Sequence, residues 1–148
     1  MAAEEDFLLA GEAHCGAAVD RTERALLVVR SADDPRIRLH FDIVHFWLAD
    51  EAIGDAVEAL LPITAHTHVT DAHKHEQDDG FDFRLLGQGD LDLVAYAKAM
   101  HAGGWDGFIT VEVSTRVWSQ EGYDPRDAAI TCYRELVAAF DKASVPHS

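Results

Sequence analysis

Basic side chains and cysteines are scarce in this chain. It has 12 lysine and arginine residues against 27 aspartate and glutamate residues, which gives a formal net charge of −15. A charge of this sign weighs against binding to a nucleic-acid backbone or to an anionic membrane surface. The two cysteines, Cys15 and Cys132, are too few for a disulfide framework, so we expect a reducing, cytoplasmic location.

Long apolar runs and a basic N-terminal start are also missing. No run approaches the ~20 residues that cross a bilayer, and the opening MAAEEDF is acidic where a signal peptide is basic. At 148 residues, 48% of them hydrophobic, the chain has the size and composition of one globular domain. We therefore expect a single domain over residues 1–148, with frayed tails at 1–6 and 144–148.

Short strand-like runs alternate with helical runs along the sequence. Strands are expected at residues 7–14, 37–46, 63–70 and 108–113. Helices are expected from Asp20, from Asp50 to Pro62, over 91–101 and from Asp124 onward. This alternation predicts an α/β fold with a parallel sheet. Four βα units make either an open four-stranded sheet or a (βα)4 half of a TIM barrel, with four parallel strands and helices on the outer face. Residues 71–90 are expected to form a long functional loop.

Metal-ligating side chains fall at the predicted carboxyl end of every strand. They are Glu12 and His14, Asp42 and His45, His66, His68 and Asp71, and Glu112. Parallel α/β folds bind ligands at this edge. Converging carboxylates repel one another, and an acid inside a strand, such as Glu112, is costly unless it is paired or bound to a cation. Together Glu12, Asp42, His68 and Glu112 would supply three oxygens and one nitrogen, which suits one Mn²⁺, Mg²⁺ or Zn²⁺ ion.

Simpler interpretations stand beside this one. A single glutamate near a strand end is usually a rim residue, and a lone histidine in a strand usually forms a hydrogen bond in the core. Recurrence at four successive strand ends is what favours a metal site. The four histidines at positions 66, 68, 73 and 75 could instead form a metal-storage loop. Cys15 lies beside His14, but a catalytic thiolate needs positive surroundings, and these are acidic.

Several segments in order resemble the C-terminal half of the sugar phosphate isomerase/epimerase family, which has the xylose isomerase-like TIM barrel. GEAHCGAAVDRTERALLVV resembles the region of that family's fifth strand, where a glutamate precedes a loop and a helix. RLHFDIVHF resembles its D-x-x-H motif, and HTHVTD resembles its H-x-H-x-x-D motif. LLGQGDLDLVAYAKAMHAGGWDGFITVEV resembles its last loop, helix and strand, ending on a glutamate. The resemblance runs from about Phe7 to Phe140, and the family's first four strands have no counterpart.

The resemblance implies a divalent-metal-dependent isomerase or epimerase. Its substrate would be a sugar, a sugar phosphate or a related hydroxy-carbonyl compound, converted through a metal-stabilised enediolate. Glu12, Asp42, His68 and Glu112 would bind one divalent metal ion, with Glu12 and Glu112 also acting as catalytic base and acid. The expected substrate contacts are His45, His14 and Lys74, the last of which replaces an arginine of the epimerases.

A half-barrel leaves two strand edges unpaired, and its concave face is expected to expose apolar side chains. We therefore expect a homo-oligomer, or a complex with a missing N-terminal half-barrel. Neither nucleic acid nor membrane is an expected partner. One alternative is a truncated, non-catalytic half-barrel that binds metal or sugar. A remote alternative is a hydrolase like the apurinic-site endonucleases, which share this barrel type but need more metal ligands and a basic DNA face.

Overall fold

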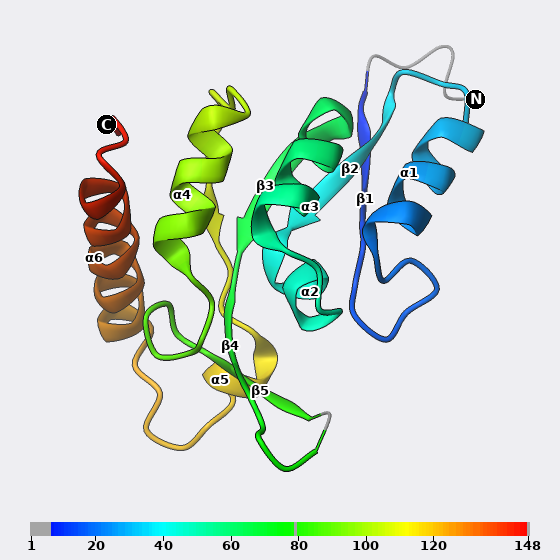
Figure 1. The fold of residues 1–148 in the computed structure, drawn as a ribbon. Coiled ribbons are helices and arrows are strands. Elements are labelled where there is room, and N and C mark those ends of the chain that lie inside the picture. Colours follow the sequence, from blue (N-terminus) through cyan, green and yellow to red (C-terminus); the bar gives the residue numbers. More distant parts are fainter. Residues whose placement is uncertain (1–6, 79, 148) are drawn as a thin grey trace.

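The computed structural model describes residues 7–78 and 80–147. Four parallel strands form one sheet in the order β1-β2-β3-β6, and two antiparallel strands form a second sheet (Figure 1). The large sheet contains β1 (Leu9–Glu12), β2 (Ile37–Asp42), β3 (Thr64–Val69) and β6 (Thr110–Val111). The small one contains β4 (Asp71–Lys74) and β5 (Phe81–Arg84). The predicted α/β class and the four parallel strands are confirmed.

Helices pack against both sheets. They are α1 (Thr22–Ser31), α2 (Ile43–Leu48), α3 (Ile53–Leu60), the 3₁₀ turn Leu61–Ile63, α4 (Leu93–Ala102), α5 (Thr115–Trp118) and α6 (Pro125–Ala143). The longer helices α1, α3, α4 and α6 lie side by side in that order (Figure 1). None of the helices in the described residues is both long and apolar enough to span a membrane.

The core lies between the sheet and these helices. Successive side chains of a strand point to opposite faces, and in β2 the apolar residues Leu39 and Phe41 are the ones buried toward the helices. In β3 the same face carries Val69. They pack with helix residues that include Leu60 and Tyr96. The opposite, concave face therefore carries the polar residues of β2 and β3.

The concave face is polar along the two central strands, β2 and β3. On β2 and β3 it presents His40 and Asp42 beside His66 and His68, which pair across the two strands. The cause is the period-two pattern of the strands, which turns their apolar residues toward the helices. The exposed large apolar side chains lie instead along the two ends of the sheet; they are Phe7, Leu8, Leu9, Leu27 and Val28 at the β1 end, and Phe108, Trp118, Ile130 and Tyr133 at the β6 end.

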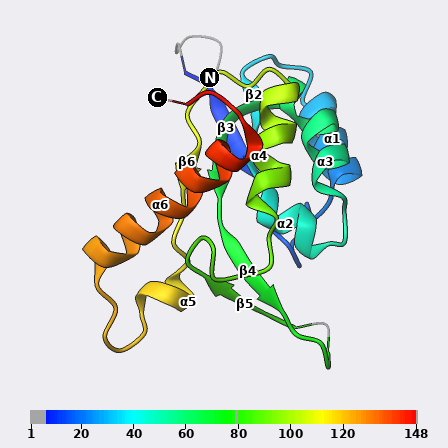
Figure 2. The same cartoon turned by 60° about the vertical axis from the view of Figure 1, so that its left-hand side comes forward.

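Residues 71–90, expected to be an irregular loop, contain the β4–β5 hairpin. It extends from the end of β3, away from the large sheet (Figure 2). Ala72 and Phe83 are buried in a small cluster with residues of α2 and α5, which explains why this polar stretch is ordered.

A second difference is helix α2, which begins at residue 43 where the sequence predicts continued strand. The run Ile43–Phe46 is wholly buried, and periodicity cannot separate strand from helix in a short buried run.

Helix ends were predicted with mixed success. Asp124 caps α6 as expected, accepting hydrogen bonds from Arg126 N and Asp127 N at 2.8 and 3.0 Å. Helix α1, expected from Asp20, begins at Thr22, whose amide donates to the Glu51 carboxylate at 3.0 Å.

The C-terminal tail is packed against α6 as far as residue 147. Val145 is buried, and His147 Nε2 lies 3.1 Å from Asp141 Oδ1. The expected N-terminal tail at residues 1–6 lies outside the described residues.

Candidate metal centre

Four predicted ligands meet at the carboxyl ends of the parallel strands. Glu12 and Asp42 are the last residues of β1 and β2, and His68 is the register partner of Asp42 on β3. Glu112 follows β6, where its amide donates to Val69 O at 3.1 Å. One donor atom from each of the four lies within 4.8 Å of the others. The sheet thus brings together residues that are 100 positions apart in sequence.

The spacing of these donors suits a single divalent cation. His68 Nδ1 lies 3.2 Å from Glu112 Oε2 and 3.7 Å from Glu12 Oε1. Two ligands bound to one ion at about 2.1 Å are separated by roughly 3.0 Å when adjacent and 4.2 Å when opposite. Three carboxylates and one imidazole form a donor set for Mn²⁺, Mg²⁺ or Zn²⁺. The residues present therefore fit the ion that the sequence predicts.

Asp42 is the most constrained member of this group, because its side chain is fully buried. Its Oδ1 accepts a hydrogen bond from Val44 N at 3.0 Å, and its Oδ2 accepts one from the Thr70 hydroxyl at 2.6 Å. Burial raises the pKa of Asp42 to about 6, even though both hydrogen bonds lower it. Thr70 was missed by the sequence reasoning, since nothing in its neighbourhood marks it as a partner of a residue 28 positions away.

The pKa of Glu12 also depends on its neighbours among the four predicted ligands. Burial raises the pKa of Glu12 above its usual range, and the negative charge of Glu112 raises it further. His68 lowers it in part. A bound cation would reverse both unfavourable effects, because it compensates for lost hydration and for the repulsion between carboxylates.

Two further histidines line the concave face next to the four ligands. The ring of His40 lies 4.0 Å from that of His68 and 4.9 Å from that of His66, measured between centroids. Burial, with the neighbouring charges of His68 and His66, lowers the pKa of His40 to about 4. His40 is therefore a neutral imidazole at pH 7. Its position could have been predicted, because His40 and Asp42 are two residues apart and so share a strand face.

The predicted substrate contacts are placed in different surroundings. His45 is buried, with its ring 3.9 Å from that of His14 and its Nδ1 3.4 Å from Cys15 Sγ. Burial, followed by the charges of His14 and His40, lowers the pKa of His45 to about 3. Lys74 Nζ donates to Asp50 Oδ1 at 2.6 Å and to the carbonyl of Trp47 at 2.9 Å. The ammonium group of Lys74 is thus engaged by the end of α2.

The four-histidine storage cluster is not assembled. His66 and His68 lie on β3, whereas His73 and His75 belong to the β4–β5 hairpin region. His73 Nδ1 lies 2.9 Å from Asp90 Oδ2, and His75 Nδ1 lies 3.1 Å from Asp78 Oδ1. Each of these two hairpin histidines therefore lies beside an acidic partner of its own.

Asp71 joins the hairpin to the loop before α4. Its buried carboxylate accepts hydrogen bonds from four backbone amides, those of Ala72, Gly87, Gly89 and Leu91, at 2.8 to 3.1 Å. This gives a structural role to the last residue of the H-x-H-x-x-D motif. A residue with a side chain at Gly89 would collide with the Asp71 carboxylate and with the carbonyl of Ala72.

We expect Asp71→Asn to destabilise the protein by about 2–3 kcal/mol. Asparagine keeps one acceptor oxygen and turns its amide hydrogens toward backbone N–H donors, which leaves buried donors unpaired. Urea unfolding monitored by circular dichroism measures the change. The exposed Asp55→Asn serves as the control and should leave the midpoint unchanged. Equal midpoints for Asp71→Asn and the unmodified protein would contradict this role.

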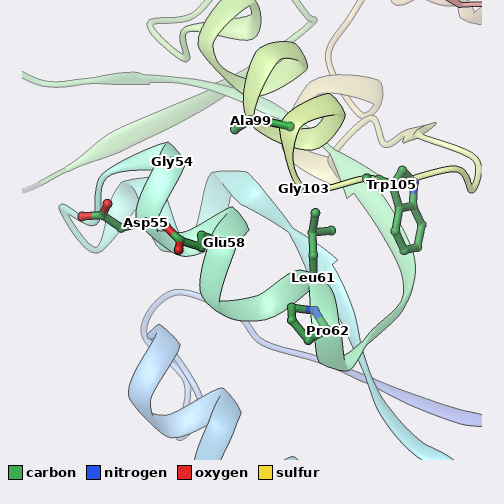
Figure 3. A pocket seen from close by; sticks show the side chains of 10 residues that line it. Gly54, Asp55, Glu58, Leu61, Pro62, Ala99, Gly103 and Trp105 are labelled. Carbon is green, nitrogen blue, oxygen red and sulfur yellow. The ribbon is translucent and has the colours of Figure 1, made fainter.

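A groove of about 580 Å³ lies on the other side of the molecule, between α3 and α4 (Figure 3). Its lining includes Glu58, Leu61, Pro62, Gly103 and Trp105. A side chain at Gly103 would press on the end of the Leu61 side chain, which would have to move. This groove lies among the helices that cover the sheet, whereas the four ligands lie at the strand ends. It contains none of the metal-ligating clusters found in the described residues.

Comparison with known proteins places the chain in a family. Residues 1–137 match the profile of the xylose isomerase-like TIM barrel family. The chain belongs to this family. A search of curated protein sequences finds no match.

Solved structures with the same fold are about twice as long. A xylose isomerase domain protein from Planctomyces limnophilus is 16% identical, with a TM-score of 0.73; the similarity covers 97% of this chain and 48% of that one. An L-ribulose 3-epimerase is 18% identical, with a TM-score of 0.70; the similarity covers 93% of this chain and 50% of that one. An IolI protein with a bound zinc atom is 22% identical, with a TM-score of 0.71; the similarity covers 92% of this chain and 50% of that one. The chain therefore spans about half of each of these TIM barrels, as the sequence predicts.

Proposed function

We propose that this chain carries the metal-binding half of an isomerase or epimerase acting on a sugar, a sugar phosphate or a related hydroxy-carbonyl compound. The observation that carries the proposal is the convergence of Glu12, Asp42, His68 and Glu112 at the ends of four parallel strands, within 4.8 Å of one another. The family and the sugar epimerases among its solved relatives support the substrate class. The two cysteines, free of any disulfide, are compatible with a reducing compartment such as the cytoplasm.

The donor set suits the chemistry of an α-hydroxy carbonyl compound. A divalent cation held by the four residues would polarise the carbonyl group and offset the negative charge of an enediolate. Asp42 is held by Thr70 and Val44, so it serves as a fixed ligand and does not move protons. Glu12 and Glu112 are less constrained and face the open concave side, half-exposed at 36% and 41% of their side chains. We assign to them the removal and return of the carbon-bound proton.

Four further histidines complete this proposed site. His40 and His66 extend the polar surface from the metal ligands along the concave face, where the hydroxyl groups of a sugar would find hydrogen-bonding partners. His14 and His45 are assigned to substrate contact at the mouth of the site. Lys74 is the third assigned contact, and its ammonium group would have to leave Asp50 to reach a substrate.

Deuterium exchange tests the proposed reaction. With Mn²⁺ present, an isomerase should exchange a substrate C–H for solvent deuterium, because the enediolate route removes that proton. NMR in D₂O with a panel of ketoses and ketose phosphates measures the exchange, and Glu112→Gln should abolish it. Binding of metal and sugar without exchange across the panel would instead support a non-catalytic binding module.

The proposed site also needs a second wall. Each end of the sheet has an unpaired strand edge flanked by exposed apolar side chains, such as Leu9 and Leu27 at one end and Phe108 and Tyr133 at the other. We propose that a second (βα)4 unit covers these ends, with a second copy of the chain filling that place when no separate N-terminal half is present.

Sedimentation at low micromolar concentration tests this assembly. We expect a species heavier than the 16.3 kDa chain. Because each copy carries a net charge of −15, association should strengthen as salt rises. Phe108→Asp, at an edge where this ring is 89% exposed, should weaken association, and Glu58→Gln on the helical face should not. A compact monomer in moderate salt would overturn the second-copy assembly.

A further inference from the structure

A second group of metal-ligating side chains lies beside the carboxylate-rich centre. His14 and Cys15 belong to the loop after β1, and His45 lies in the first turn of α2. His45 Nδ1 is 3.4 Å from Cys15 Sγ, and His14 Nδ1 is 3.9 Å from the same sulfur. One donor atom from each of the three lies within 4.8 Å of the others. None of these residues is among the four ligands assigned above.

These separations match those of ligands around a tetrahedral ion. With Zn–S bonds near 2.3 Å and Zn–N bonds near 2.0–2.1 Å, tetrahedral angles place neighbouring donors about 3.5 Å apart. The two observed sulfur–nitrogen separations, 3.4 and 3.9 Å, lie on either side of that value. Small rotations of the side chains would therefore bring the three donors to one ion.

The local backbone holds the three donors in place. His14 N donates to Val19 O at 2.9 Å and Ala17 N donates to His14 O at 3.0 Å, which closes the loop into a turn. Gly16 has a positive φ of 76° within that turn, a conformation that a β-branched or bulky residue would resist. His45 is 4% exposed, and its ring packs edge-on against Phe83. Three side chains held in this way lose little conformational freedom when an ion binds.

We propose that His14, Cys15 and His45 form a second metal site, specific for thiophilic divalent cations of the zinc class. One thiolate and two imidazoles select Zn²⁺ or Co²⁺ over Mg²⁺ and Mn²⁺, which prefer oxygen. Three protein ligands leave the fourth position open to water or to an added ligand. His14 is exposed, so this fourth position has a path from solvent. The site uses none of the four ligands of the carboxylate-rich centre, but it shares His14 and His45 with the substrate contacts proposed above, so an ion bound here would take these two side chains from the substrate.

A thiol nucleophile is the competing role for Cys15, and its surroundings disfavour it. Burial raises the pKa of the Cys15 thiol above its ordinary value, and this is the largest effect. A backbone hydrogen bond and Arg116 lower the pKa in part, and the carboxylates of Asp42 and Asp20 raise it. Without a metal, Cys15 is thus a protonated thiol at pH 7. A bound zinc ion would deprotonate it directly, because a coordinated thiol loses its proton.

Cobalt titration of the purified protein tests the site. A cysteine thiolate bound to Co²⁺ gives a sulfur-to-cobalt charge-transfer absorption in the near ultraviolet, which oxygen and nitrogen ligands do not produce. We expect this band in the unmodified protein and in Cys132→Ser, whose sulfur is buried elsewhere in the core. Cys15→Ser should abolish it, and His14→Ala should weaken Co²⁺ binding at least about tenfold. Glu112→Gln should keep the band, which separates this site from the carboxylate-rich one.

Alkylation gives a second, spectrally independent readout. In the Cys132→Ser background, saturating Zn²⁺ should slow the reaction of Cys15 with iodoacetamide at least about tenfold, because a coordinated sulfur is a poorer nucleophile. Saturating Mg²⁺ should leave the rate unchanged. A protein saturated with Co²⁺ that lacks the charge-transfer band, or a Cys15→Ser variant that retains it, would overturn the proposal. So would equal protection of Cys15 by Zn²⁺ and Mg²⁺.

Discussion

Replacing Asp42 with asparagine should make the metal-free protein more stable at pH 7.5, by about 1–3 kcal/mol. Burial raises the pKa of this carboxyl to about 6 from its ordinary value of 3.8. A carboxyl with a raised pKa contributes stability that is present below pH 3.8 and is lost as the pH rises through 6. At pH 7.5 the folded chain thus holds a buried charge that costs it stability, and a tenfold change in the protonation equilibrium corresponds to about 1.4 kcal/mol.

Asparagine removes that charge and keeps the local hydrogen bonds. Its oxygen can accept from Val44 N, and its amide can donate to the Thr70 hydroxyl, whose own hydrogen is free to rotate. Urea unfolding at pH 4 and at pH 7.5, with chelator present, measures the difference between variant and unmodified protein. The gain should appear at pH 7.5 and be nearly absent at pH 4. Asp55→Asn, an exposed carboxylate on α3, is the matched control. Destabilisation of Asp42→Asn at pH 7.5 would show that the buried carboxylate is not under electrostatic strain.

Asp42 should bind metal poorly when its carboxyl group is protonated or is replaced by the neutral amide of asparagine. We expect one Mn²⁺ or Zn²⁺ ion to bind the carboxylate-rich centre of the unmodified protein at pH 7.5. Glu112→Gln and His68→Ala should each weaken this binding at least about tenfold, as should Asp42→Asn. Binding should also weaken below pH 6, because protons then compete for Asp42. Isothermal titration calorimetry with Mn²⁺ gives the affinities, since Mn²⁺ does not favour the thiolate site.

Two controls make this series specific. Glu58→Gln removes one negative charge from the far helical face, so it tests whether net charge alone explains a loss of affinity. Cys15→Ser should leave Mn²⁺ binding unchanged. Bound metal should also raise the unfolding free energy by about 2.7 kcal/mol at a hundredfold excess over the dissociation constant. Unchanged Mn²⁺ affinity in both Glu112→Gln and His68→Ala would remove this centre from consideration.

The sheet and the four ligands could be predicted because they depend on local patterns and one topological rule. Each strand of the large sheet is marked by a short strand-like run, and parallel strands joined by helices place their carboxyl ends at one edge. Glu12, Asp42, His68 and Glu112 therefore had to be neighbours once the alternation was recognised. The polarity of the concave face also follows from this pattern, since His40 lies two residues before Asp42 and shares its strand face.

The remaining features depend on contacts between distant residues, so the sequence alone did not predict them. Thr70 binds Asp42 across 28 positions, and Lys74 binds Asp50 across 24. The β4–β5 hairpin is ordered because its Ala72 and Phe83 pack against α2 and α5. The run after Asp42 is buried on all sides, so its helical form leaves no periodic signal.

Anomalous diffraction from crystals soaked in Mn²⁺ locates the bound ion and its ligands. We expect one strong peak at the carboxyl ends of β1, β2, β3 and β6, with ligand atoms of Glu12, Asp42, His68 and Glu112 at about 2.1–2.2 Å for manganese bound to oxygen and nitrogen. The peak should be absent from crystals of His68→Ala soaked in the same way. A manganese peak held by other residues, with these four side chains left uncoordinated, would contradict the account.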